Sequence, residues 1–183
     1  PAAGAVKSAA ASFSNAARSH SAAAFSSALS RHSNVSSLAM FALGPYRKNL
    51  PAARQGEYIR SAHRYMGQFL AKNAGRISAS GLKISSCKGN LVETQAGGRE
   101  ITWRVAGGRI QDVRVGGVWL AGQLRSKFTG MIRSRGGDVG AFVDVDDLGR
   151  RELALGLSQH RDVASEDLGV HVRLAFEAHA ALG

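Results

Sequence analysis

Residues 81–115 read GLKISSCKGNLVETQAGGREITWRVAGGRIQDVRV, and this stretch decides the fold. Apolar and polar side chains alternate along it, for example through Ile101, Trp103 and Val105, which is typical of β-strands with one buried face. Short turn sequences interrupt the alternation, namely Lys88-Gly89-Asn90, Gly97-Gly98 and Gly107-Gly108. Because turns this short join neighbouring antiparallel strands, the stretch predicts a four-stranded antiparallel meander.

Helical spacing appears on both sides of the meander. Residues 34–43 predict a short helix that is capped by Asn34 or Ser33 and ends at Gly44-Pro45, and residues 54–73 predict a longer helix. After the meander, apolar residues recur at helical spacing and predict a helix that ends before residues 136–137; they are Leu120, Leu124, Phe128, Met131 and Ile132. The order of elements predicts an α+β fold, with N-terminal helices wrapped around a curved sheet and one helix after it.

Composition divides the chain into three parts. Residues 1–28 are rich in Ala and Ser and predict one helix with a frayed start. Residues 29–148 hold the other predicted helices and strands and form the main domain. Residues 149–183 form an acidic tail, in which eight large apolar residues need cover, so we expect the tail to be ordered against its own body or a second copy; they are Leu153, Leu155, Leu157, Leu168, Val170, Val172, Leu174 and Phe176.

Positive charge is concentrated in the body of the chain. The 183 residues contain 24 Lys+Arg and 13 Asp+Glu, for a formal net charge of +11. Residues 1–137 hold 20 basic and 4 acidic side chains, whereas residues 138–183 hold 4 basic and 9 acidic ones. A basic body indicates nucleic acid, anionic lipid or an acidic protein as partner. Nucleic-acid binding is the weakest of these, because no helix-turn-helix signature and no RNA-recognition aromatic pair accompanies the charge.

The sequence shows no catalytic or metal-binding constellation. Cys87 is the only cysteine, which excludes an internal disulfide and a zinc site built on cysteine pairs. The 6 histidines show no metal-ligand spacing on a predicted helix, so we expect no metal. Asp112 stands out in the acid-poor body, and we expect it to form an ion pair with a nearby arginine rather than to act in catalysis. No apolar run approaches the length of a transmembrane helix.

Several stretches in order resemble one family. The resemblance begins with the apolar helix, Leu-Gly and Tyr-Arg of residues 34–47, continues through Arg54, Tyr58 and Tyr65, and is strongest in residues 110–120, IQDVRVGGVWL. It extends through Leu124-Arg125, Phe128 and Ile132 to residues 136–143, and covers about residues 25–148. In this pattern the chain resembles the MlaC or toluene-tolerance family, and most closely its hopanoid-associated HpnM branch. Trp119 stands where the family usually has a serine.

The resemblance implies a periplasmic phospholipid carrier rather than an enzyme. It implies an NTF2-like shape in which helices wrap a strongly curved antiparallel sheet around a deep apolar cavity. The implied partners are a phospholipid or hopanoid-type lipid, an outer-membrane lipoprotein complex, and an inner-membrane ABC transporter with an MCE-domain subunit, with transient contact to membrane surfaces. No cofactor is implied beyond the bound lipid. A signal peptide is expected to have been removed, because the sequence has no initiator methionine.

A two-chain lipid requires an apolar binding site. About 30 methylenes at about 0.8 kcal/mol each make its transfer out of water worth about 25 kcal/mol. The expected cavity wall consists of Phe41, Tyr65, Met66, Phe69, Trp103, Val105, Val113, Val118, Trp119, Phe128 and Ile132. Each of these residues can equally belong to a filled core. Headgroup or partner contacts are expected from Tyr46, Arg47 and Arg125.

Two rival functions remain open from the sequence alone. An NTF2-like enzyme or small-ligand module predicts a convergent polar site formed by Asp112, Tyr46 and Arg47. A basic nucleic-acid-binding protein predicts affinity that falls steeply as salt increases.

Overall fold

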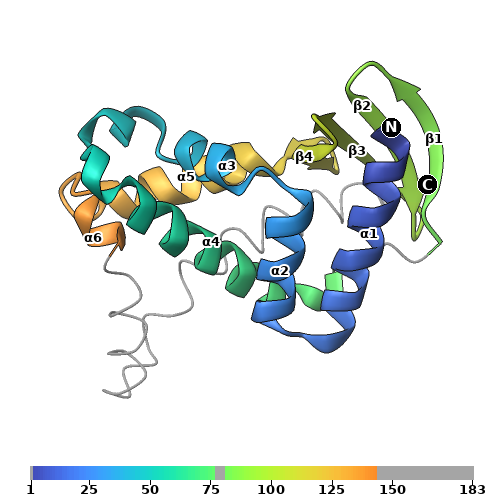
Figure 1. Ribbon diagram of the computed structural model, residues 1–183, viewed down its shortest axis with the longest axis horizontal. Coiled ribbons are helices and arrows are strands. Elements are labelled where there is room, and N and C mark those ends of the chain that lie inside the picture. Colours follow the sequence, from blue (N-terminus) through green and yellow to red (C-terminus); the bar gives the residue numbers. More distant parts are fainter. Residues whose placement is uncertain (1, 77–80, 144–183) are drawn as a thin grey trace.

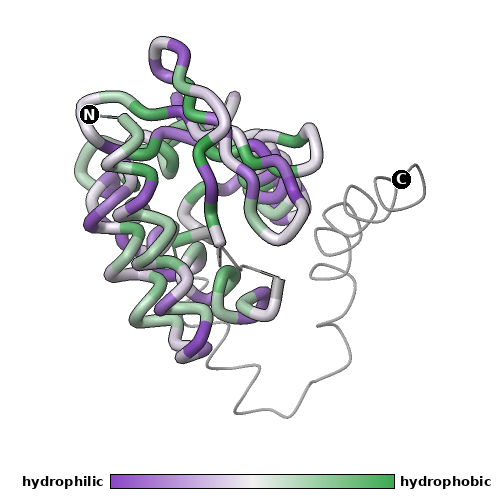
Figure 2. The backbone as a smooth tube through the Cα atoms, turned by 90° about the vertical axis from the view of Figure 1, so that its right-hand side faces the viewer, coloured by the Kyte–Doolittle hydropathy of each residue, from purple (hydrophilic) through white to green (hydrophobic). Residues whose placement is uncertain are grey.

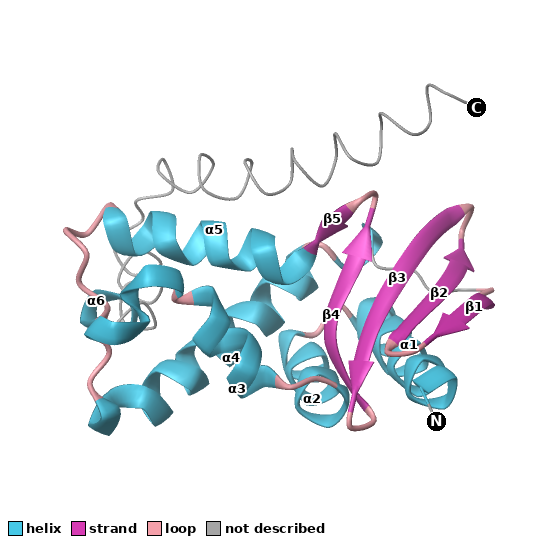
Figure 3. Ribbon diagram, turned by 90° about the horizontal axis from the view of Figure 1, so that it is seen from above, coloured by secondary structure: helices cyan, strands magenta, loops and turns pink. Residues whose placement is uncertain are grey.

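The sheet, with the first helix packed against one of its faces, forms one end of the molecule, and the third to sixth helices form the other (Figures 1 and 3). The computed structural model describes residues 2–76 and 81–143. Four helices come first: α1 (Ala2–Ser19), α2 (Ala22–His32), α3 (Val35–Ala42) and α4 (Gln55–Lys72), with 3-10 turns at Gly44–Asn49, Ala52–Arg54 and Ala74–Arg76. The sheet follows, and then α5 (Leu120–Arg133) and α6 (Gly140–Val143). This arrangement confirms the predicted α+β fold, with helices before and after an antiparallel sheet.

The N-terminal segment forms two helices, so the prediction of one helix over residues 1–28 is wrong. The break falls at His20, which adopts a left-handed backbone with φ 50°. Ser21 then starts α2 in an extended conformation, and its hydroxyl accepts a hydrogen bond from the Ala24 amide at 3.2 Å. A serine cap offers the amides of a new helix an acceptor, and this local signal outweighs the helical preference of the surrounding alanines. Helix α2 continues across residues 28 and 29, where the main domain is predicted to start.

Helices α3 and α4 confirm the helices predicted at residues 34–43 and 54–73. The Asn34 side chain caps α3 by accepting the amide of Ser37 at 3.2 Å. Gly44 follows α3 with φ 54°, a conformation that favours glycine.

The sheet has five strands rather than the predicted four. They pair in sequence order and antiparallel: β1 (Lys83–Lys88), β2 (Leu91–Ala96), β3 (Arg99–Ala106), β4 (Arg109–Val115) and β5 (Val118–Trp119). The missed strand, β5, has only two residues, too few to show an alternating pattern. Both glycines in each of the three later turns have positive φ, at residues 97–98, 107–108 and 116–117. That geometry is what two-residue hairpins require.

The two faces of the sheet differ in what covers them. Cross-strand partners share a face, and the row Val92, Trp103 and Val113 lies on the face that α1 covers. A sheet cluster forms there from Val6, Ala9, Ala10, Val92, Trp103, Val105 and Ile110. The opposite face carries Arg104 and Arg114. Figure 2 shows apolar and polar segments alternating along helices and strands, as amphipathic elements require.

A second apolar core lies among the helices. This helix cluster consists of Leu29, Ala39, Ala42, Leu43, Tyr58, Ala62, Met66, Phe128, Ile132, Val139 and Val143. A smaller cluster joins α1 and α2 through Ala16, Ala17, Phe25 and Ala74. Phe13 of α1 packs against all three clusters and stacks on Phe25 with ring centroids 6.4 Å apart. Helix α1 is therefore the element that connects the sheet half to the helical half.

The acidic tail and Cys87 differ in whether the structure describes them. The acidic tail at residues 149–183 lies outside the described residues. Cys87 is exposed on β1 at the edge of the sheet. None of the helices in the described part of the chain combines the length and hydrophobicity that a membrane-spanning helix requires.

Candidate functional site

The expected wall residues divide between the two large clusters. Tyr65, Met66, Phe128 and Ile132 belong to the helix cluster or pack against it, and Trp103, Val105 and Val113 do so for the sheet cluster. Phe69 stacks on Tyr65 with ring centroids 6.5 Å apart. The structure therefore groups most of the expected wall, but on two sides of α1 instead of around one centre.

Polar atoms among these apolar residues have partners. The indole Nε1 of Trp103 donates to Thr94 Oγ1 at 2.9 Å, and that hydroxyl donates to the Ile101 carbonyl at 3.2 Å. Tyr58 donates its hydroxyl to the Ala39 carbonyl at 2.6 Å. Burial raises the pKa of Tyr65 to about 12, so its phenol stays neutral at physiological pH. Both clusters are therefore uncharged interiors suited to apolar contacts.

Three of the expected wall residues lie elsewhere. Phe41 is 45% exposed, and the Arg125 guanidinium lies 5.3 Å from its ring centroid. Trp119 pairs with Arg114 in register, which places it on the sheet face opposite α1, and Arg104 lies 4.2 Å over its ring. Val118 is half-buried on β5. Sequence patterning could not separate these positions from the clusters, because they are as apolar as the residues that are buried.

Asp112 has a structural partner that the sequence did not indicate. Its Oδ1 accepts the backbone amides of Val113 at 2.8 Å and of Ala121 at 2.9 Å. Ala121 lies in the first turn of α5, so the carboxylate caps that helix from a neighbouring strand. The expectation of an ion pair with arginine is wrong: within residues 2–76 and 81–143 the ion pair found is Arg54–Glu57, at 3.1 Å.

The rival polar site does not assemble. Asp112 sits at the start of α5, whereas the Tyr46 ring lies 3.5 Å from the position of a Cβ built on Gly137, beyond the end of that helix. Helix α5 has 14 residues, and at about 1.5 Å per residue its ends are about 21 Å apart. Arg47 is exposed near Tyr46. These three side chains therefore do not converge on one ligand.

The capping role predicts how Asp112 variants behave. Asp112→Ala removes the acceptor of two amides, and we expect it to lower the free energy of unfolding by about 1–2 kcal/mol. Asp112→Asn retains a side-chain oxygen and should cost less than half as much. Urea denaturation of both variants measures the difference. Equal losses would show that the negative charge, and not the acceptor, is what the fold uses.

Hydrogen bonds tie the N-terminal helices together. Ser12 Oγ of α1 lies 2.8 Å from His32 Nε2 of α2. His63 Nε2 of α4 donates to the Ser26 carbonyl of α2 at 2.8 Å. Arg109 of β4 donates to the carbonyls of Ser33 and Ser30, at the end of α2. Helix α2 is thereby linked to α1, α4 and the sheet.

His32 makes stability depend on pH. Burial, and then the nearby Arg31 and Arg109 guanidinium groups, lower the pKa of His32 from its ordinary value of 6.5. The unfolded chain therefore binds a proton more readily, so stability is lost as pH falls through 6.5. We expect the melting temperature to fall between pH 7.5 and pH 5.0, and His32→Gln to reduce that fall. An unchanged fall in the variant would assign the pH dependence to other groups.

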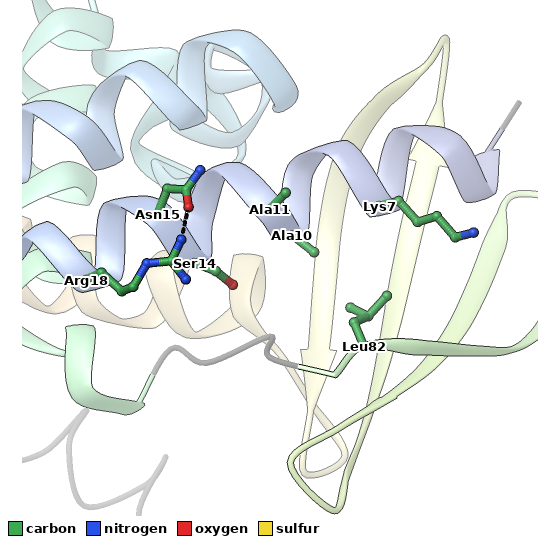
Figure 4. A pocket seen from close by; sticks show the side chains of 7 residues that line it. All are labelled: Lys7, Ala10, Ala11, Ser14, Asn15, Arg18 and Leu82. Atoms are coloured by element: carbon green, nitrogen blue, oxygen red, sulfur yellow. Dashed lines mark hydrogen bonds between the residues drawn. The ribbon is translucent and has the colours of Figure 1, made fainter.

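A groove along α1 was not anticipated. It holds about 320 Å³ and is lined by Lys7, Ala10, Ala11, Ser14, Asn15, Arg18 and Leu82 (Figure 4). Residues 7, 11, 14 and 18 repeat at helical spacing, so the sequence did contain a signal for this face. The many alanines and serines of the segment mask this spacing. In the described ranges no three His, Cys, Asp or Glu side chains gather as a metal site.

Helices wrapped over an antiparallel meander, with an apolar cluster on each side of α1, define a helix-wrapped α+β protein. A model of the MlaC protein family matches residues 5–143, and the chain belongs to this family. Among solved structures, the fold is similar to that of a phospholipid-binding protein from Ralstonia solanacearum, determined in complex with a phospholipid. The TM-score is 0.58 and the identity 16%, over 82% of this chain and 97% of that chain. No curated protein matches the chain.

Proposed function

We propose that this protein binds a phospholipid and carries it between membranes. The observation that carries the proposal is that the chain belongs to the MlaC family and shares its fold with a protein whose structure contains a phospholipid. The uncharged side chains of the helix and sheet clusters support it, because acyl chains need walls of this chemistry.

The acyl chains lie between the two clusters, along the inner side of α1. Phe13 contacts both clusters, so a chain that displaces it gains apolar surface on either side. The wall residues are those of the expected set that belong to the clusters or pack against them, together with Phe69, which stacks on Tyr65: Tyr65, Met66, Phe69, Trp103, Val105, Val113, Phe128 and Ile132. An apolar interior of this kind approaches the bilayer in affinity without greatly exceeding it, which lets the protein both extract and deliver a lipid.

The proposal extends to location and partners. The carrier works in the periplasm and exchanges its lipid with an outer-membrane lipoprotein complex and an inner-membrane ABC transporter that has an MCE-domain subunit. A hopanoid-type lipid is a second cargo of suitable chemistry. The body holds 20 basic side chains against 4 acidic ones up to residue 137, which favours transient contact with anionic membrane surfaces. The protein acts by binding and release and not by catalysis.

A transfer assay tests carriage. Donor vesicles contain a fluorescent phospholipid at self-quenching density, and acceptor vesicles contain none. We expect the full chain to accelerate dequenching in proportion to its concentration. Vesicles without protein give the baseline rate. Val105→Asp, which places a charge in the sheet cluster, should reduce the rate, whereas the exposed-site variant Lys88→Gln should not. Transfer at the baseline rate would contradict the proposal.

A further inference from the structure

The groove on α1 combines charge with an apolar wall. Lys7 and Arg18 carry positive charges at its two ends, and none of its lining residues is acidic. They are eleven residues apart, which is about 16 Å along a helix axis. Ala10, Ala11 and Leu82 lie between them, and Figure 4 shows Leu82 opposite Ala10. The groove therefore runs along one face of α1 and is lined by two cations and no acid.

Among the described residues, no carboxylate forms an ion pair with Lys7 or Arg18. In the part of the chain that the structure describes, the carboxylate ion pair is Arg54–Glu57, on another element. The Arg18 guanidinium donates to the Asn15 side-chain oxygen, a neutral acceptor that orients it. An anion at this end of the groove would meet a guanidinium already held in place.

The apolar wall leads into the sheet cluster. Ala10 is a member of that cluster and is 4% exposed, and Leu82 packs against it. A ligand with its polar end at Arg18 can therefore place apolar atoms beside Ala10 and Leu82, at the boundary between α1 and the sheet. This combination fits an amphiphile with a negative headgroup, and it does not fit a free inorganic anion, which has no use for the apolar wall.

We propose that the α1 groove binds the headgroup of an anionic phospholipid, with the phosphate beside Arg18 and Asn15 and with Lys7 adding attraction from the other end. The inference rests on the proposed function and adds to it a choice of cargo: lipids with a net negative headgroup are retained better than zwitterionic ones. The acyl chains pass Ala10 and Leu82 and enter beneath α1.

Competition between two lipids tests the inference. The full chain is incubated with vesicles that contain phosphatidylglycerol and phosphatidylcholine of identical acyl chains in equal amounts, and the lipid recovered with the protein is quantified by mass spectrometry. We expect phosphatidylglycerol to be enriched, and Arg18→Gln to reduce the enrichment by about three- to tenfold, as for a partly exposed charge-assisted contact. Arg18→Lys, which keeps the charge, should retain part of it.

Controls separate the possible failures. Lys88→Gln removes an exposed charge at the end of β1 and should leave the enrichment unchanged, which excludes a general effect of net charge. Glycerol phosphate added at a large excess should not abolish the enrichment, because it lacks acyl chains; if it does, the groove is a free-anion site. Equal recovery of both lipids by the unaltered protein would overturn the headgroup assignment alone. Recovery of neither lipid would overturn the proposed function itself.

Discussion

Phe128→Ala is expected to lower the free energy of unfolding by about 3–5 kcal/mol, the range for removing a fully buried aromatic ring. Phe128 has no exposed surface, and its ring meets the Tyr65 ring edge to face at a centroid distance of 5.3 Å. The same cluster includes Leu43, which follows α3, and Ile132 of the same helix, and Tyr65 of α4 packs against it. The substitution therefore opens a cavity at the centre of the helix cluster.

Phe41→Ala is the matched control for Phe128. It removes the same ring from a position that is 45% exposed, so its cost should stay below about 1 kcal/mol. Chemical denaturation of both variants measures the two values. A cost for Phe128→Ala as small as that for Phe41→Ala would mean that the Phe128 ring is not packed against its neighbours as the structure describes.

Gly67→Ala should destabilise the protein although alanine is the better helix former. A Cβ at Gly67 would overlap the Ser26 hydroxyl and lie 2.9 Å from the Ala22 carbonyl oxygen, where α4 crosses α2. The hydroxyl can rotate away, but the backbone carbonyl cannot, so the helices must separate. Overpacking of this kind costs about 1–3 kcal/mol and outweighs a propensity gain of about 1 kcal/mol.

Gly130→Ala should have the opposite effect on stability. Gly130 is exposed on α5, and a Cβ there meets no atom within 4 Å. Only the propensity gain remains, so this variant should be more stable by about 0.5–1 kcal/mol. Thermal melts of the two alanine variants should move in opposite directions. Two shifts of the same sign would show that α2 and α4 do not approach as closely at Gly67 as the structure indicates.

Strong local patterns account for what the sequence predicted well. The period-two alternation in residues 91–105 and the paired glycines define β2, β3 and β4, because each strand has one buried face and each turn needs positive φ. The helix at residues 54–73 was equally clear from its apolar spacing. Where a single physical requirement repeats several times along the chain, the sequence pattern predicts the element correctly.

The errors occurred where one tertiary contact decides the outcome. The break at His20 depends on a single Ser21 cap within an alanine-rich stretch, and β5 depends on pairing with β4 and not on its own two residues. The partner of Asp112 is an amide of Ala121, which no charge pattern reveals. The role of Phe13, which packs against all three clusters, depends on how α1 crosses the sheet and has no signal in the sequence.

The sequence predicted the chemistry of the candidate site but not its geometry. Apolar stripes identified most members of the two clusters, but apolar character alone also selected Phe41 and Trp119, which lie outside them beside arginines. The α1 groove has no clear sequence signal, because two cations eleven residues apart in a low-complexity segment look like an ordinary solvated helix face. Distinguishing the two requires knowing that Leu82 lies opposite.

The most direct test of the central claim is organic extraction of the full chain purified from bacteria, followed by mass spectrometry of the extract. Phospholipid binding predicts a two-chain lipid near one molecule per protein chain, and its disappearance from a parallel sample that was denatured and washed before extraction. A protein that carries no lipid, and that also takes up none after incubation with phospholipid vesicles, would contradict the claim.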